Sequence, residues 1–252
     1  MKENYQHNEV FSFDVVWETA IIKLKSRAFQ VLLDLPLKKA FLDCLITISE
    51  KKGIKGLIIF DSPECHDYEN YIEFARAAFS RESINTLTEM ELSRFGNAGR
   101  QITMELLKFT KPIIVGIQGR VPIENFGYYL PCDYRIAAEN MQIEFPDLNL
   151  GIPPGAASYF ISKEIGPNKT LEMYLTGKTL SASEARKLNI INEIVPSDDL
   201  YNACEERLDQ LFMLTSNSLV AMKPLIKPDL PEIESHLEHS WDVFWSATPP
   251  RE

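Results

Sequence analysis

The sequence predicts a protein of the α/β class, in which helices alternate with parallel strands. Two short apolar runs, GLIIF at 56–60 and KPIIVGIQG at 111–119, have the composition of strands buried on both faces of a sheet. Helical patterns fill the long segment between them, and a crossover of that length joins parallel strands. The chain has 252 residues, 45% of them hydrophobic, which is enough for a sizeable core.

The N-terminal part is predicted to contain two strands and a helix. Residues 12–25 mix β-branched and aromatic residues with turn-like breaks, a pattern typical of two short strands, and the residues before them form a polar leader. Asp34 is a good N-cap for the helix that follows, with Pro36 in its first turn and Gly53 at its end.

The middle of the chain continues the alternation. Helical patterns are present in IEFARAAF at 72–79 and again from about residue 89 to residue 108. The segment DYRIAAENMQIEF at 133–145 predicts two more short strands. Gly155 is predicted to open a helix and Gly166 to close it.

The C-terminal part begins with a helix-start signal. Ser181 and Glu184 have the spacing of a capping box, in which each residue bonds the backbone of the other. EIVP at 193–196 predicts a last strand, and Ser197 is expected to cap a helix that runs to Phe212. Three prolines predict a rigid connector over 223–232, followed by a final helix over 233–245.

Charge and composition exclude several classes of protein. The 26 Lys and Arg residues against 36 Asp and Glu give a net charge of −10, which argues against binding to nucleic acid or anionic membranes through bulk charge. No apolar run approaches the roughly 18 residues of a membrane span, and the first residues lack the apolar core of a signal peptide, so a cytoplasmic location is expected. The four cysteines are widely separated, and neither a metal site nor a disulfide is expected.

Several segments of the chain, taken in order, carry a family resemblance. They are KPIIVGIQG at 111–119, CDYRIAAEN at 132–140, FPDLNLGIPPGAA at 145–157 and LTGKTLSASEARKLNIINEIVP at 175–196. Their order and spacing resemble the crotonase superfamily, which contains the enoyl-CoA hydratases and isomerases. A weaker likeness, LKSRAFQVL from Leu24 onward, is similar to the segment that lies beside the CoA adenine in that family.

The resemblance implies a fold, a ligand and an assembly. It implies a spiral of ββα units over 1–196, a helical oligomerisation region over 197–252, and a homotrimer or hexamer. It implies an acyl-CoA substrate, no further cofactor, and a place in fatty acid metabolism. Apolar residues at helical spacing in the final helix are expected to pack across subunits: Leu237, Trp241, Phe244 and Trp245.

The same resemblance implies a CoA-binding segment near the N-terminus. Lys25 and Arg27 align with this segment and are expected to pair with phosphate groups. Ala28 and Phe29 follow them in the same segment and are expected to contact CoA.

The two loops that bind the thioester oxygen in the family differ here from its pattern. The second loop, normally a run of glycines, reads VPIENFGYY at 121–129, and the position of the family's first catalytic glutamate is Gly127. The first loop reads HDYENY at 66–71. Since any residue except proline supplies a backbone N–H, Asn70 and Glu124 are predicted as the two oxyanion-hole donors.

Three side chains are candidates for acid/base chemistry. Asp147 aligns with the family's second catalytic glutamate, the carboxylate that its isomerases need, although an aspartate here could instead cap the turn at 148–151. Glu124 either takes over the acid/base role missing at Gly127 or opposes thioester chemistry by its charge. His66 lies in a polar loop, where it is either solvated or an acid/base group at the substrate entrance.

Other polar residues nearby have simpler interpretations. Glu144 is expected to be exposed, and Tyr128 and Tyr129 to pack in the core. Cys65 is not expected to act as a thiolate, since no group that would orient it is visible.

Three functions remain open. The missing carboxylate at Gly127 and the presence of Asp147 favour double-bond isomerisation through a thioester enolate. A hydratase, decarboxylase or hydrolase would need relocated groups such as Glu124, Asp67 or His66. A non-catalytic paralogue that binds acyl-CoA or a protein partner is the alternative. The loops at 66–71 and 122–126 are predicted to line one pocket because each follows a buried strand.

Overall fold

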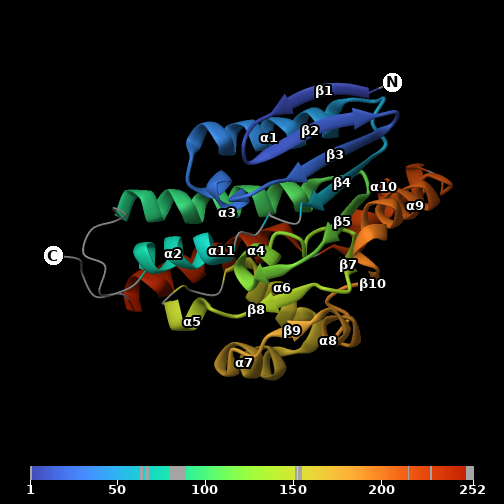
Figure 1. The fold of residues 1–252 in the computed structure, drawn as a ribbon. Helices are drawn as coiled ribbons and strands as arrows, with labels where there is room; N and C mark the ends of the chain where they lie inside the picture. Colours follow the sequence, from blue (N-terminus) through green and yellow to red (C-terminus); the bar gives the residue numbers. More distant parts are fainter. Residues whose placement is uncertain are drawn as a thin grey trace.

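The main feature of the structure, a computed structural model, is a seven-stranded sheet in the order β1-β2-β3-β4-β5-β7-β10 (Figure 1). The structure describes residues 2–62, 65, 68–79, 89–150, 152, 155–214, 216–227 and 229–247. The strands are β1 (Lys2–His7), β2 (Phe11–Val16), β3 (Thr19–Leu24), β4 (Gly56–Asp61), β5 (Ile113–Ile117), β7 (Tyr134–Ala138) and β10 (Glu193–Val195). The first three strands pair antiparallel, and the pairs from β3 to β10 are parallel.

Helices cover both faces of this sheet. On one face, the 3-10 helix η1 (Ala28–Leu32), α1 (Leu35–Glu50) and α3 (Glu89–Lys108) pack together over the large core. On the other face, α9 (Leu200–Phe212) lies against β4, β5 and β7. Both faces of these parallel strands are therefore buried, which explains their continuous apolar sequences.

A second, three-stranded sheet brings the polar loops together. It contains β6 (Arg120–Pro122), β8 (Gln142–Glu144) and β9 (Leu180–Ser181). The short helix α4 (Ile123–Phe126) continues directly from β6, and α5 (Asp147–Leu150) follows β8. Helix α2 (Tyr68–Phe79) contacts both β6 and α5, so the three candidate segments converge on one side of the molecule.

The remaining helices lie in the second half of the chain. They are α6 (Ala156–Ile165), α7 (Pro167–Thr176), α8 (Ala182–Lys187), the 3-10 helix η2 (Ser197–Asp199), α10 (Ser216–Ile226) and α11 (Leu230–Ala247). The last helix packs against α3 and α6. No helix in the described part of the chain is both long and apolar enough to cross a membrane.

Most predicted elements are confirmed. The two strands over 12–25 are β2 and β3, and the Asp34 side chain accepts the Leu37 N–H at 2.8 Å as the N-cap of α1. The Ser181 and Glu184 capping box is formed in both directions. Gly155 and Gly166 flank α6 as its caps.

The residues of the polar leader form the edge strand β1, which pairs with β2 and which the sequence analysis did not predict. Two expectations about the elements are wrong. Ser197 does not cap a helix through its side chain, since the chain first makes the 3-10 turn η2 and Asp199 becomes the N-cap residue of α9. The residues Lys223 to Ile226 are helical, with Pro224 inside α10, instead of a connector.

The final helix packs on its own chain. Ile233 and Leu237 are buried in the large core, and the Trp241 ring lies 6.4 Å from the Phe95 ring on α3. The side chains of Phe244 and Trp245 lie outside the described residues. Leu237 is therefore buried within its own chain, contrary to the expectation that it packs across subunits, whereas the expectation for the half-buried Trp241 stays a prediction.

Arg135 joins two distant parts of the fold. Its side chain, 7% exposed, donates from Nε to the Ile190 carbonyl at 2.7 Å and from Nη1 to the carbonyls of Cys132 at 3.0 Å and Leu130 at 3.3 Å. Its backbone N–H donates to Asn192 Oδ1 at 2.8 Å. The turn after α4 and the segment before β10 are thus held by one residue.

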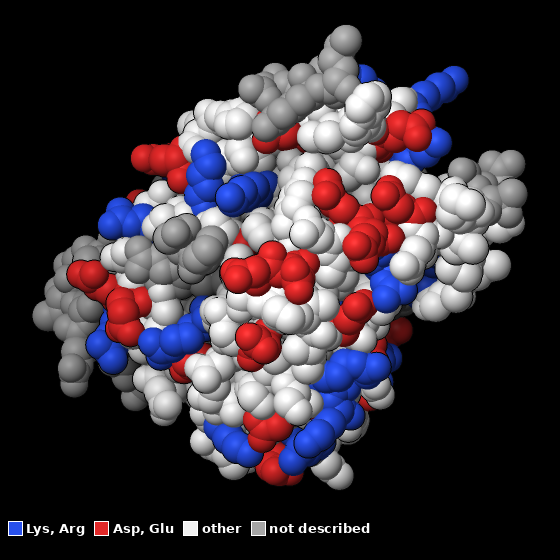
Figure 2. Space-filling view, turned by 45° about the vertical axis from the view of Figure 1, so that its right-hand side comes forward, with Lys and Arg blue, Asp and Glu red and all other residues white. Residues whose placement is uncertain are grey.

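Charges on the surface are separated into groups. Figure 2 shows one face on which Asp and Glu side chains gather near the middle, while most Lys and Arg side chains lie around them, toward the lower edge and the left. The charged side chains are therefore unevenly distributed over this face.

Candidate active site

An apolar cavity lies between the predicted CoA-binding segment and the second loop. Its volume is about 70 Å³. Ala28 and Phe29 line it from η1, and Asn125, Tyr128 and Tyr129 line it from α4 and the turn that follows. The remaining lining residues are apolar: Leu24, Val31, Leu32, Phe41, Ile59, Ile102 and Leu106. Two segments nearly one hundred residues apart in sequence thus form one small cavity.

Aromatic contacts fix the wall of this cavity at Phe29. Its ring stacks on Phe74 of α2 at 5.3 Å and meets the Tyr71 ring edge-on at 6.0 Å. The start of α2 is therefore attached to η1.

The second loop forms a helical turn instead of a glycine run. Pro122 precedes α4, and no side chain caps the helix. Glu124 is in its first turn, where backbone N–H groups have no acceptor within the helix. The backbone N–H of Glu124 thus needs an acceptor outside the helix, and its role as an oxyanion-hole donor stays a prediction.

Gly127 has no room for a side chain. A Cβ atom added there would lie 2.9 Å from the Ala157 nitrogen and 3.0 Å from the Glu124 carbonyl oxygen. Both atoms belong to the backbone, so neither moves easily. The packing of α4 against α6 thus leaves no space for a side chain at the position where the resemblance predicts the family's first catalytic glutamate.

The Glu124 carboxyl group points toward the start of α6. It accepts the Gly155 N–H at 3.3 Å, and Gly155 approaches so closely that an added Cβ would lie 2.6 Å from Glu124 Oε1. Burial raises the pKa of Glu124 to about 7, and the Gly155 N–H offsets part of this effect. A carboxyl group that titrates near neutral pH beside a cavity is a candidate acid/base group.

Glu124 lines a second, polar cavity of about 20 Å³. Tyr128 lines this cavity as well as the apolar one. Burial, followed by the charge of Glu124, raises the pKa of Tyr128 well above its usual range. Thr103 of α3 also faces this cavity. Its hydroxyl is fully buried and has no hydrogen-bond partner among the residues that the structure describes.

Sequence reasoning did not identify Thr103 as a site residue. The signal available was the spacing of Gly96, Gly99 and Thr103, which places small residues on one face of α3. That pattern indicates a close approach of other elements, and the structure places Trp241 against Gly96 and Tyr128 against Gly99.

The first loop and the second sheet are joined through Arg120. Its guanidinium lies 3.8 Å above the Tyr68 ring and pairs with Glu69 at 3.2 Å and Glu144 at 2.6 Å. The Glu144 side chain is 16% exposed, so the expectation that it is exposed is wrong. Burial and then the Glu144 carboxylate raise the pKa of Tyr68 to about 12. Arg120 and Glu144 thus hold the start of α2 in place.

Asp61, at the end of β4, stabilises the turn after α4. Its buried carboxylate accepts the Tyr129 hydroxyl at 2.6 Å and the Cys65 thiol at 3.6 Å. The Tyr129 ring is also in edge contact with Phe126 at 6.1 Å. Tyr129 packs in the core, as predicted, and Cys65 is buried.

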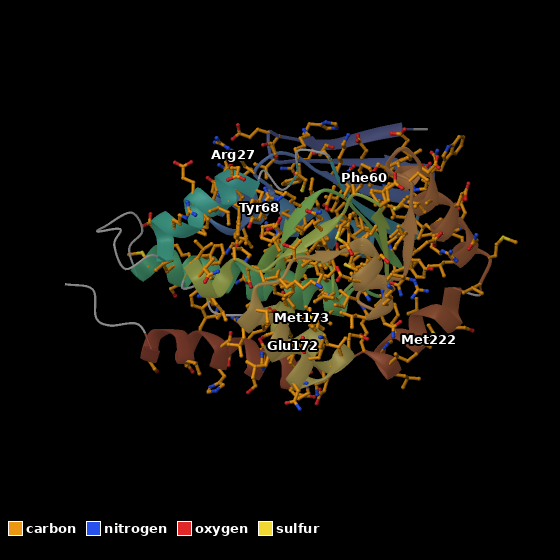
Figure 3. All side chains as sticks on the ribbon, turned by 60° about the horizontal axis from the view of Figure 1, so that its bottom comes forward. Arg27, Phe60, Tyr68, Glu172, Met173 and Met222 are labelled. Carbon is orange, nitrogen blue, oxygen red and sulfur yellow. The ribbon has the colours of Figure 1, made fainter. Side chains whose placement is uncertain are left out.

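The other predicted site residues are placed as follows. Lys25 Nζ donates to the Asn8 carbonyl at 2.6 Å, and Arg27 is exposed with a left-handed φ of 59°. Figure 3 shows Arg27 and Tyr68 toward the same edge of the molecule, away from Met222. Asn70 lies in the first turn of α2.

Two candidate acid/base groups are described only in part or not at all. Asp147 is the first residue of α5, and the structure describes its backbone but not its side chain. His66 and Asp67 lie outside the described residues. Residues of α2 line neither of the two cavities described above, so the shared pocket of the two loops stays a prediction.

Comparison with known structures identifies the fold. An enoyl-CoA hydratase from Bacillus halodurans superposes with a TM-score of 0.77 at 21% identity, covering 94% of each chain. An enoyl-CoA hydratase from Bacillus anthracis gives a TM-score of 0.73 at 21% identity, covering 96% of this chain and 92% of that one. The predicted crotonase-like α/β fold is therefore confirmed.

Sequence comparison identifies the family. The sequence profile described as enoyl-CoA hydratase/isomerase matches residues 81–238, more than half of the chain. The chain belongs to the enoyl-CoA hydratase/isomerase family.

Individual relatives are more distant. A crotonyl-CoA hydratase of Syntrophomonas wolfei is 25% identical over 159 residues, 63% of this chain and 58% of that protein. An enoyl-CoA isomerase/hydratase of Mycosarcoma maydis is 28% identical over 166 residues, 65% of this chain and 60% of that protein. The matches thus cover less than two thirds of the length of either relative.

Proposed function

We propose that the protein binds an acyl-CoA thioester and shifts a double bond along the acyl chain through an enolate, with Asp147 as the single acid/base. The observation that carries this proposal is the closed position at Gly127. Adding water generally calls for a second group that positions and activates the water, whereas isomerisation returns a proton on the face from which it left. A chain with no room for the first glutamate fits isomerisation better.

In this mechanism, Asp147 removes a proton from the carbon between the thioester and the alkene and returns it two carbons along. The negative charge that develops on the thioester oxygen needs two backbone donors, assigned to the N–H groups of Asn70 and Glu124. Losing one such donor typically costs about 3 kcal/mol of transition-state stabilisation. Aspartate is shorter than glutamate by one C–C bond, roughly 1.5 Å, so the substrate must lie correspondingly closer.

The placement of the Glu124 side chain is compatible with enolate chemistry. Its carboxyl group lines the polar cavity, whereas the neighbouring Asn125 lines the apolar one. With a pKa of about 7, the group is largely neutral when an anion forms nearby, because a second negative charge raises the pKa further. Glu124 is therefore a second candidate proton donor, and His66, which the sequence suggests as an acid/base group, is a third.

The apolar cavity is the proposed place for the acyl group. It is bounded by Ala28 and Phe29 of the CoA-binding segment and by Asn125 of the second loop. Lys25 and Arg27 precede this wall, and their positive charges suit the phosphates of CoA. Acyl-CoA is thus the expected partner.

A non-catalytic role in binding acyl-CoA or a protein partner is the second candidate function. It is favoured by the buried side chains of Ile123 and Asn125, which stand where the family has glycines. A glycine run lets a thioester approach the backbone closely, and side chains reduce that access.

The test compares wild type with Asp147→Asn in an assay that converts 3-enoyl-CoA into 2-enoyl-CoA, alongside calorimetric binding of the same thioester. We expect turnover in wild type and a loss of at least a hundredfold in the variant with binding retained. Unchanged isomerisation in Asp147→Asn contradicts the single-base mechanism. Binding without turnover in wild type supports the non-catalytic role.

Glu124→Gln separates isomerase from hydratase chemistry. If Glu124 has taken over the missing second role, the variant loses hydration of 2-enoyl-CoA and retains isomerisation. If Asp147 works alone, wild type shows isomerisation and little hydration, and Glu124→Gln shows the same two activities as wild type.

A further inference from the structure

The apolar and polar cavities share one wall, the side chain of Tyr128. The apolar cavity, at about 70 Å³, is roughly half the size of the 150 Å³ cavity that takes up benzene in an engineered protein. It has room for a few carbon atoms. The polar cavity, at about 20 Å³, has room for one water-sized group.

The polar cavity contains hydrogen-bonding groups that are not fully used. The Thr103 hydroxyl, fully buried, has no partner among the described residues. The Glu124 carboxyl group accepts one long hydrogen bond, of 3.3 Å, from the Gly155 N–H. Buried polar groups normally have hydrogen-bond partners. A ligand group that forms hydrogen bonds with both Thr103 and Glu124 would supply partners for these two side chains.

The far end of the polar cavity is closed by aromatic packing. Trp241 packs so closely against α3 that a Cβ atom added at Gly96 would collide with its ring. The Tyr128 hydroxyl would lie 2.5 Å from a Cβ atom added at Gly99. Trp241 also borders a surface groove of about 350 Å³. The indole therefore lies between the polar cavity and the surface groove, where it limits the length of an acyl chain that enters from the apolar cavity.

We propose that Thr103 and Tyr128 are specificity-determining residues that select a short acyl-CoA with a hydroxyl group on the distal carbon. The carbon chain occupies the apolar cavity, and the hydroxyl passes the Tyr128 ring to bond Thr103 and Glu124. This inference rests on the proposed function, because it takes the ligand to be an acyl-CoA. It adds the class of acyl group.

The decisive measurement is the ratio of two dissociation constants. Butyryl-CoA and 4-hydroxybutyryl-CoA differ by one hydroxyl group, and isothermal calorimetry gives the affinity of each. Wild type is expected to bind the hydroxylated probe at least about fivefold more tightly, the effect of one net hydrogen bond. Octanoyl-CoA is expected to bind no more tightly than butyryl-CoA.

Substitutions at Thr103 test where the preference arises. Thr103→Val removes the hydroxyl at constant shape and should bring the ratio to about one, with butyryl-CoA affinity within about twofold of wild type. Thr103→Ser keeps the hydroxyl and should keep the preference. Thr170→Val, at a buried threonine of α7 that bonds the Gly166 carbonyl, is the matched control and should leave the ratio unchanged.

Tyr128→Phe is a second, isosteric variant in case Thr103→Val fails to fold. It should lower the ratio of the two dissociation constants about twofold or more. Trp241→Ala should open the polar cavity toward the groove and strengthen octanoyl-CoA binding about fivefold.

The outcomes separate this inference from the proposed function. Equal affinity for the two four-carbon probes in wild type, or a preference that survives Thr103→Val, overturns the inference while leaving acyl-CoA binding intact. Absence of binding by every probe overturns the proposed function and the inference with it.

Discussion

Glu124 carries a proton that the unfolded chain would release. Its pKa is about 7 in the folded protein, against 4.5 for an ordinary glutamate. Below about pH 4.5 the carboxyl group is protonated in both the folded and the unfolded state. Its protonation then makes its full contribution to the free energy of unfolding. Between pH 4.5 and 7 only the folded state keeps the proton, so the free energy of unfolding falls as pH rises, by up to about 3 kcal/mol.

Glu124→Gln should remove this dependence. The difference in unfolding free energy between wild type and Glu124→Gln, from urea denaturation at a series of pH values, is expected to fall between pH 4.5 and 7 and then level off. The exposed Glu73→Gln on α2 controls for the loss of a carboxylate. A difference that is constant over this range would contradict the buried, proton-holding carboxyl group.

The sequence predicts part of the site at this scale. The sequence alone predicts that Gly127 stands where the family has a carboxylate, because this prediction depends only on the order and spacing of residues along the chain. It does not show where the Glu124 side chain points, since Gly155 and Ala157, which decide this, are about thirty residues away. Thr103 was missed for the same reason, because its burial depends on Tyr128 and Trp241 from other elements.

Helices α4 and α6 touch at Gly127, and this contact gives a second prediction. Gly127→Ala should destabilise the protein by roughly 1–3 kcal/mol, because the new methyl group meets backbone atoms 2.9 and 3.0 Å away. Gly53→Ala is the matched control, since an added Cβ there has no atom within 4 Å, and it should change stability by less than about 0.5 kcal/mol. Equal unfolding midpoints for the two variants in urea would contradict the packing.

At the scale of helices and strands, the sequence predicts best those elements that depend on residues adjacent in the chain. The buried strands β4 and β5 and the capping box of α8 depend on residues adjacent in sequence, and all are confirmed. Helix α10 was missed because Pro224 normally breaks a helix. Tertiary contacts hold it: Lys223 Nζ bonds Asp133 at 2.7 Å, and Lys227 Nζ bonds the Pro131 carbonyl at 2.8 Å.

For the whole molecule, we expect a homotrimer or a hexamer. Large apolar side chains are exposed on α10 and on the turn before it, where Met213, Leu225 and Ile226 are 87, 85 and 72% exposed. A concentration of exposed apolar side chains commonly marks an interface. Light scattering should give three or six times the 28.8 kDa of one chain.

Lysine substitutions locate that interface. Leu225→Lys combined with Ile226→Lys should lower the mass toward that of one chain, whereas Met90→Lys on α3, also at an exposed apolar residue, should not. A wild-type mass of a single chain at micromolar concentration would contradict the assembly.

The hydrogen bonds of Arg135 to backbone carbonyls couple the local opening of two segments of the native protein. Its guanidinium serves the turn at Leu130 and Cys132 and also Ile190. If either segment detached alone, some N–H groups of the buried Arg135 guanidinium would lose their carbonyl acceptors, a cost that local openings rarely bear. The two segments should therefore open together, and amide hydrogen exchange at Cys132 and Asn192 should report the same opening free energy although sixty residues of chain separate them.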